Sequence, residues 1–255
     1  YGDANKDVRL IGKELGVENV LEGSIQRERD NLRVNVKLTR ALDGSGLWAE
    51  TYDRKVESIF GVQDEISKAV VNALRIELVA GQDYMLVKRY TQNPDAYNLY
   101  LQGRLAWNTG SEAGVRRSVE LYQEAIAKDP NFALAYASIA DAYNLMPVMG
   151  MMDSAEAFPK ARVAAETALK IDDALAEGYI SLALIKAAYD WDWLGAEIDL
   201  NWAIGLNPNY ALAYVVYGNL LKFIGRADEA LANLEKAREL DPESRLVASA
   251  IGDFF

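Results

Sequence analysis

Apolar and small side chains recur at helical spacing through the last two thirds of the chain. The pattern is clearest in residues 211–244, where two successive stretches carry them three and four positions apart: Tyr214, Tyr217, Gly218, Leu221, Ala230, Leu234 and Ala237. This spacing places one face of each stretch against a core, as in an amphipathic helix. Gly225 lies between the stretches and Pro242 follows the second, so the pattern predicts two helices joined by a turn.

A short sequence motif that ends in Pro or Asp lies at the end of each such helix pair. It occurs at residues 125–130, 168–173, 203–208 and 237–242, and the last two copies start 34 positions apart. That period and the order of large and small residues resemble the tetratricopeptide repeat (TPR). A single pair cannot bury its own apolar face, so the copies are expected to stack into an α-α superhelix.

Four repeats and the start of a fifth helix pair are expected in residues 94–255. The fourth copy, 211–244, is regular, and the third, 176–210, has about one extra residue. The second copy carries an insertion of about nine residues between its helices, and the first, 94–130, is the least regular. After Pro242 a further first helix begins, so we expect the array to continue past Phe255.

The first 80 residues follow a different pattern. Apolar residues have helical spacing at both ends of this region, and between the two ends apolar and polar residues alternate with a period of two. The predicted order is helix, three strands, helix, over residues 5–15, 20–29, 32–40, 47–52 and 59–78. Asp30-Asn31 is a hairpin signal, and a two-residue loop there would pair Ile25 with Val36 and Leu21 with Arg40. Leu21 and Ile25 would then share the apolar face of the sheet. We expect a small α+β domain over 1–80, with one helical layer on an antiparallel sheet, and a linker over 81–93.

Composition limits the chemistry that this mainly α-helical chain can perform. Among its 255 residues are no Cys and no His, which excludes disulfides, thiol nucleophiles and imidazole bases. Gly44-Ser45-Gly46 lacks the Lys-Ser/Thr of a phosphate loop. Asp190, Asp192 and Asp199 lack the spacing of a calcium loop. The sequence therefore predicts no enzymatic activity, no cofactor and no metal site.

The negative charge of the chain is concentrated in the repeats. Residues 1–90 have a net charge of −1 and residues 91–255 a net charge of −10. Because nucleic-acid binding requires cationic side chains, no nucleic-acid partner is expected for this segment. No apolar run reaches the roughly 18 residues of a membrane helix. Localisation stays open: periplasmic if a membrane helix precedes Tyr1, cytoplasmic otherwise.

Several motifs resemble the TolB-like amino-terminal domain of bacterial signalling proteins. They lie at residues 11–17, 20–24, 47–54 and 60–66, and Tyr189-Asp190-Trp191-Asp192-Trp193 is similar to the repeat segment that follows this domain. The resemblance implies that the chain holds only the second part of the domain, which usually begins with a further strand and helix. Such proteins often carry an adenylate or guanylate cyclase domain, or a winged-helix DNA-binding domain, upstream. The resemblance thus implies the regulatory part of a signalling protein.

Polar residues on the predicted first helices are candidates for partner binding. By register they point toward the inner, concave wall of the superhelix, where an extended peptide could receive hydrogen bonds to its backbone. The candidates are Asn98, Asn108, Asp141, Asn144, Asn219 and Lys222. The alternative is an ordinary solvated surface.

The insertion in the second repeat is rich in methionine. Met146, Met149, Met151 and Met152 could form an adaptable apolar contact with a partner, and simple packing of the long loop is the alternative. Trp191 and Trp193 are predicted to close the gap between the two helices of the third repeat.

Together these patterns predict a module for protein–protein interaction and regulation, with a protein or peptide as partner and no chemistry of its own. The alternative is a scaffold or self-assembly module that uses the open edge of the sheet, with a homodimer as its product.

Overall fold

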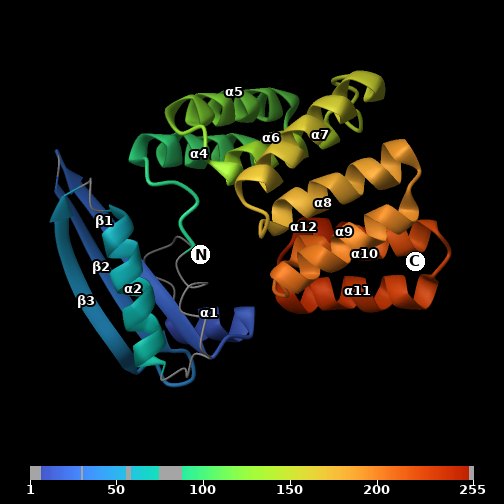
Figure 1. Ribbon diagram of the computed structural model, residues 1–255. Helices are drawn as coiled ribbons and strands as arrows, with labels where there is room; N and C mark the ends of the chain where they lie inside the picture. Colours follow the sequence, from blue (N-terminus) through green and yellow to red (C-terminus); the bar gives the residue numbers. More distant parts are fainter. Residues whose placement is uncertain (1–6, 30, 56–58, 75–87, 253–255) are drawn as a thin grey trace. The chain divides into compact units, whose positions relative to one another are not determined.

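The computed structural model describes residues 7–29, 31–55, 59–74 and 88–252 (Figure 1). The chain forms two compact units, Tyr1–Arg89 and Tyr90–Phe255. We call them the sheet unit and the repeat unit and describe each by itself. The chain is mainly α-helical with one small antiparallel sheet, which confirms the predicted fold class.

The sheet unit has the predicted order of elements. They are α1 (Val8–Leu15), β1 (Asn19–Glu28), β2 (Asn31–Arg40), β3 (Gly46–Lys55) and α2 (Ile59–Ala73). The strands are antiparallel in the order β1-β2-β3, and α2 lies across one face of the sheet (Figure 1). The end of the predicted second helix, residues 75–78, lies outside the described residues.

The core of the sheet unit forms where α2 meets β2 and β3. Alternate residues of the central strand β2 are buried, and Val34 and Val36 pack with Tyr52 of β3 and Val62 of α2. Trp48 and Ile66 are partly buried against this cluster. The period-two alternation thus identified the buried face of β2 correctly.

The predicted hairpin register is wrong by two residues. Ile25 pairs with Val34, and Leu21 pairs with Leu38. The turn therefore follows Glu28, which pairs with Asn31, and Arg29 adopts a positive φ of 54°, as favoured two-residue hairpin turns require. A shift of two positions keeps every side chain on its predicted face, so the face assignment survives the error.

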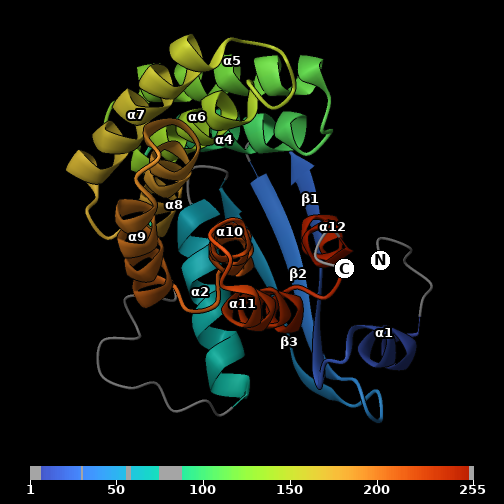
Figure 2. The same ribbon diagram turned by 90° about the vertical axis from the view of Figure 1, so that its right-hand side faces the viewer.

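The repeat unit consists of antiparallel helix pairs, followed by a further helix. Its elements are α4 (Pro94–Trp107), α5 (Glu112–Lys128), α6 (Ala133–Leu145), α7 (Ser154–Ile171), α8 (Ala176–Ile185), η2 (Lys186–Asp190), α9 (Trp193–Leu206), α10 (Ala211–Phe223), α11 (Ala227–Leu240) and α12 (Arg245–Gly252). Figure 2 shows the first helices of the pairs, α4, α6, α8 and α10, on the inner side of a curve, with the second helices outside.

Glycines allow the two helices of a pair to approach closely. A Cβ atom on Gly218 would lie 2.8 Å from Leu234 Cγ and 3.1 Å from the Ala230 carbonyl oxygen. At the equivalent place in the first pair, a Cβ atom on Gly103 would lie 2.4 Å from Tyr122 Cε1. The small residues of the repeat therefore sit where no larger side chain fits.

The extra residue of the third repeat lies in η2, a short π-helix that continues α8. Ala183 and Ala196 are thirteen positions apart, whereas Gly218 and Ala230 are twelve apart. A π-helical turn absorbs one inserted residue without ending the helix. Trp191 follows η2 with a positive φ of 60°, and its backbone N–H donates to the Lys186 carbonyl oxygen. The insertion thus changes the connection and leaves the core of the repeat in register.

Candidate peptide-binding groove

Side chains of two neighbouring first helices are joined on the inner wall of the repeat unit. Asp141 Oδ1 on α6 accepts a hydrogen bond of 2.5 Å from Ser181 Oγ on α8. Asn144 Nδ2, one turn further along α6, donates to the Ser181 carbonyl oxygen at 3.1 Å. Two predicted groove residues therefore also connect the second repeat to the third.

Asn144 is less accessible than the sequence suggested. Only 7% of the residue is exposed, because its side chain extends from α6 toward α8, where it donates to the Ser181 carbonyl oxygen. Its Oδ1 atom is buried as well and accepts no hydrogen bond from any residue that the structure describes. Asn144 thus offers a buried acceptor beside the wall, rather than an exposed amide on it.

Burial also perturbs the carboxyl group of Asp141. The pKa of Asp141 is raised to about 7, chiefly by burial and in addition by the nearby charge of Glu177 on α8. The hydrogen bond from Ser181 and the charge of Arg104 on α4 act in the opposite direction. This carboxyl therefore titrates near neutral pH, where an ordinary aspartate is fully ionised.

Tyrosines and an arginine from neighbouring repeats complete this part of the wall. Arg104 Nη1 donates to Tyr100 Oη at 3.1 Å, both on α4. Burial raises the pKa of Tyr210, which precedes α10, and the charges of Asp141 and Glu177 raise it further. Six residues from three successive repeats thus form one electrostatic cluster, which we call the groove cluster: Tyr100, Arg104, Asp141, Glu177, Ser181 and Tyr210.

Arg104 was missed by the sequence analysis, although a signal for it exists. The close approach of Gly103 to Tyr122 fixes the register of the first repeat. Arg104 then follows the small residue of its helix as Asp141 follows Ala140 and Asn219 follows Gly218. The position after the small residue therefore marks the same place on each first helix.

The remaining predicted groove residues lie at exposed positions. Asn98 is on α4, and Asn108 is the carboxyl-terminal cap of that helix. Asn219 and Lys222 are on α10. Their part in binding stays a prediction.

The methionine-rich insertion packs against the protein itself. Met146 is buried with Val115 and Val119 of α5 and with Ala142 of α6. The three other methionines, Met149, Met151 and Met152, are partly buried against the same cluster. The structure therefore supports packing of the loop, and a partner contact through these residues stays a prediction.

The prediction that the two tryptophans after η2 fill the gap between the helices of the third repeat is wrong. Trp191 and Trp193 instead contact Phe223, at the end of α10, with ring centroids 6.4 and 5.7 Å away. Both tryptophans are exposed. The reason is the extra residue of η2, since the left-handed backbone at Trp191 turns the chain before α9 begins.

The acidic residues near η2 have structural partners. Asp190 accepts a hydrogen bond from Arg162, and Asp192 caps the amino terminus of α9. Asp199 is buried and pairs with Lys186 Nζ at 2.6 Å. Across the described ranges, no group of three or more His, Cys, Asp or Glu side chains could hold a metal ion.

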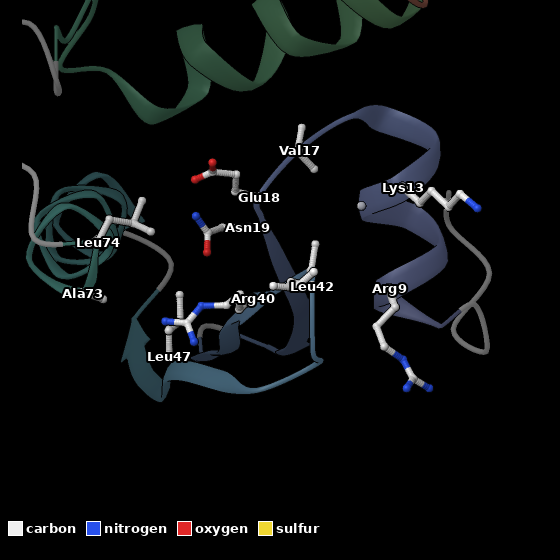
Figure 3. Close-up of a pocket in the computed structure, with 12 residues that line it drawn as sticks. Arg9, Lys13, Val17, Glu18, Asn19, Arg40, Leu42, Leu47, Ala73 and Leu74 are labelled. Atoms are coloured by element: carbon white, nitrogen blue, oxygen red, sulfur yellow. The ribbon is translucent and has the colours of Figure 1, made fainter.

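A hollow of about 1000 Å³ occurs in the sheet unit, between α1 and the end of α2. Figure 3 shows that Arg9 and Lys13 extend from α1 away from the other lining side chains, and Leu42 and Leu47 contribute apolar surface. Because its charged groups do not converge on a common point, this hollow is not a candidate site.

Comparisons with known proteins show partial similarity to two curated proteins. No protein-family model matches it. A protein named putative adenylate cyclase 3 of Rhizobium meliloti (strain 1021) is 39% identical over 143 residues, which cover 55% of this chain and 24% of that protein. The transcriptional regulator HilA of Salmonella typhimurium is 26% identical over 148 residues, 58% of this chain and 27% of that protein. The chain thus spans about a quarter of the length of these relatives.

A solved structure supports the repeat assignment. The crystal structure of a thermophilic TPR protein from Thermus thermophilus matches with a TM-score of 0.51 and 22% identity, over 74% of this chain and 98% of that one. The helix pairs therefore have the TPR fold, which confirms the predicted fold class. In repeat arrays of this kind the extended concave surface serves for binding. Within the described part of the chain, no helix is both long and apolar enough to cross a membrane.

Proposed function

We propose that the repeat unit binds an extended segment of a partner protein along the inner wall of its first helices. The observation that carries this proposal is the groove cluster, in which buried and exposed polar side chains of three successive repeats are linked by hydrogen bonds and charge. A solvated surface would not need a carboxyl whose pKa is held near 7 by burial.

The groove cluster favours a segment that contains a basic side chain. Within the groove cluster the carboxyl groups of Asp141 and Glu177 outnumber the one cation, Arg104, and the repeat unit as a whole is acidic. The exposed Arg104 and the partly exposed Tyr210 can hydrogen-bond the peptide backbone, which gives affinity without much dependence on sequence. A Lys or Arg of the partner would displace water from Asp141 and stabilise its charged form.

The proposed biological role is that of a regulatory module in a bacterial signalling protein. The curated relatives are named as an adenylate cyclase and a transcriptional regulator, and the matched part is a minority of each. The TolB-like motifs of the sheet unit support the same role. That the full-length protein acts in signalling is likewise a proposal.

Binding can be tested with extended peptides of equal length and basic, neutral or acidic composition. We expect the full chain to bind the basic peptides most tightly. Asp141→Asn keeps the acceptor for Ser181 but removes the charge, and should weaken basic-peptide binding roughly tenfold, as the loss of a charge-assisted hydrogen bond does. Glu235→Gln, on the outer helix α11, is the matched control and should bind as the wild type does. Equal affinity for all peptides, or equal effects of the two substitutions, would contradict the proposal.

One observation favours the alternative of assembly through the sheet. Leu21 and Ile25 of β1 are 49% and 67% exposed, although they share a face with the buried residues of β2. β1 is an edge strand, and an uncovered edge can pair with another chain. Replacing Ile25 with Lys should abolish self-association if this edge is used, and should have no effect on it otherwise.

A further inference from the structure

The second helix of the third repeat has an unusual outer face. Leu194, Ile198 and Trp202 of α9 are 71%, 51% and 60% exposed and stand four positions apart. In an α-helix such residues form one continuous ridge. Among the other second helices, α5 and α11 expose no large apolar residue and α7 exposes Val163 alone, all three helices being described throughout.

The exposed face of α9 also carries no charge. Throughout α9, which the structure describes completely, the exposed positions are Trp193, Leu194, Ile198, Asn201, Trp202 and Gly205. Its two carboxylates are neutralised elsewhere: Glu197 accepts hydrogen bonds from Arg226 and Tyr217, and Asp199 is buried against Lys186. By contrast, α11 carries exposed ion pairs such as Lys236 with Glu239.

Aromatic contacts hold both ends of this face in place. Trp202 stacks on Tyr179 with ring centroids 6.5 Å apart. At the other end, Trp193 lies edge-on to Phe223 at 5.7 Å. Aromatic side chains fixed in this way lose little conformational entropy when a partner covers them, which is typical of interface anchors.

From this face we infer that α9 binds α9 of a second copy of the chain. The two helices would cross antiparallel about a two-fold axis at Ile198, so that Leu194 packs against the partner's Trp202. The spacing is symmetric about Ile198, and a two-fold interface must be complementary to itself in this way. A smaller side chain at one end of the ridge meets a larger one from the other copy.

The charge of the protein restricts where two copies can meet. Each copy has a net charge of −11, so two copies repel at most surfaces, and the uncharged face of α9 is where they can meet without facing like charges. The same negative charge disfavours an anionic membrane surface, to which an exposed tryptophan patch could otherwise bind. The interface is separate from the inner wall, because α9 lies on the outer side of the repeats (Figure 2).

Cysteine cross-linking tests the geometry directly, since the natural chain contains no Cys. We expect Ile198→Cys to form a disulfide-linked dimer under mild oxidation. Leu194→Cys alone should not, because its two copies would be about 12 Å apart along the helix axis, beyond the roughly 7 Å limit for a disulfide. A mixture of Leu194→Cys and Trp202→Cys chains should cross-link to each other. Val163→Cys, exposed on α7, is the matched control.

Self-association in solution provides the second measurement. The wild type should sediment as a concentration-dependent dimer. Ile198→Glu would place two carboxylates opposite each other and should weaken association at least about tenfold, whereas Val163→Glu and Ile25→Lys should leave it unchanged. Circular dichroism would establish whether each variant is folded. If Ile198→Glu is unfolded, the cysteine cross-linking series tests the interface instead.

Three results would overturn the inference. The first is a wild type that stays monomeric at high micromolar concentration. The second is loss of the dimer in Ile25→Lys with retention in Ile198→Glu, which would assign association to the sheet edge. The third is recovery of the wild type on anionic vesicles in place of dimer formation, with Ile198→Glu abolishing that binding.

Discussion

The two units of the chain place their apolar side chains in contrasting surroundings. In the repeat unit, a Cβ atom added to Gly218 would lie 2.8 Å from Leu234 Cγ, so the helix pair has no spare room. In the sheet unit, Leu38 is 2% exposed, whereas Leu21, directly opposite on the same face, is half exposed. Stacked repeats cover a helix from several sides, but one helix on three strands leaves the edge strand uncovered.

This difference shows that residue type alone does not determine how much an apolar side chain contributes to the free energy of unfolding. Leu21 and Leu38 share strand geometry, face and pairing, but Leu38 lies on the central strand and is buried, whereas Leu21 lies on the edge strand and is exposed. In the repeat unit, η2 has a comparable effect, because one extra residue leaves Trp191 and Trp193 exposed. Measured stabilities should therefore follow coverage rather than hydrophobicity.

The largest effect is expected for Leu38→Ala. This substitution removes a buried side chain from the central strand and should lower the free energy of unfolding of the sheet unit by about 2–5 kcal/mol. Leu21→Ala is the matched control, since the same atoms are removed from the opposite residue on the same face, and it should cost well under half as much. Chemical denaturation of both variants would measure the difference. Equal losses would mean that β1 is covered as well as β2.

A smaller loss is expected for Gly218→Leu in the repeat unit. The new side chain would collide with Leu234 and the Ala230 carbonyl, and overpacking of this kind costs about 1–3 kcal/mol. Gly61→Ala in α2 is the comparison in the sheet unit, because a Cβ atom there meets nothing within 4 Å. It should leave stability unchanged or raise it by up to about 1 kcal/mol, as Ala favours the helix. A stable Gly218→Leu variant would contradict the close packing of the pair.

The sequence predicted most of the fold because several signals agreed. Four copies of one sequence motif defined the helix pairs, and the alternation of apolar and polar residues defined the buried face of β2. The hairpin register failed because it depends on one turn, and nothing local distinguished a loop at Arg29 from one a residue later. The outcome at Trp191 was not predictable either, because the sequence showed an extra residue but not that η2 would absorb it.

The candidate site was less predictable than the fold. Register alone suggested Asp141 and Asn144, but only the structure shows that both engage Ser181 of the next repeat. Arg104 belongs to the least regular copy, so its position became clear only from the contact between Gly103 and Tyr122. Contacts within and between helix pairs therefore carry the information that the sequence pattern of a repeat lacks.

Asp141→Asn should stabilise the repeat unit at high pH. A carboxyl whose pKa rises from 3.8 to about 7 on folding contributes fully to stability only below 3.8, and that contribution is lost as the pH rises through about 7. At pH 8 the wild type therefore bears the whole cost of a buried charge. We expect the variant to be more stable there by about 1 kcal/mol or more, because one pKa unit corresponds to about 1.4 kcal/mol. Thermal unfolding at several pH values would show the gain shrinking toward pH 4. A gain independent of pH would contradict the assignment of the perturbed pKa.

The smallest effect is expected for the exposed ion pair between Arg33 and Asp53 on the sheet. Arg33 donates to both oxygens of Asp53, at 2.7 and 3.1 Å, and this lowers the pKa of that carboxyl. Both side chains are nevertheless more than half exposed, so water and salt screen their attraction. Arg33→Gln should leave the melting temperature of the sheet unit unchanged within error at physiological salt.

The contrasting pair lies in the repeat unit, where Asp199 is buried beside Lys186. Lys186→Gln should lower the melting temperature, because it leaves a carboxylate in a poorly solvated place without its partner. The same change of a cation to an amide thus compares a covered with an uncovered pair, as Leu38 and Leu21 compare covered and uncovered leucines. If both substitutions lowered the melting temperature equally, and neither effect depended on salt, coverage would not be the property that separates the two units.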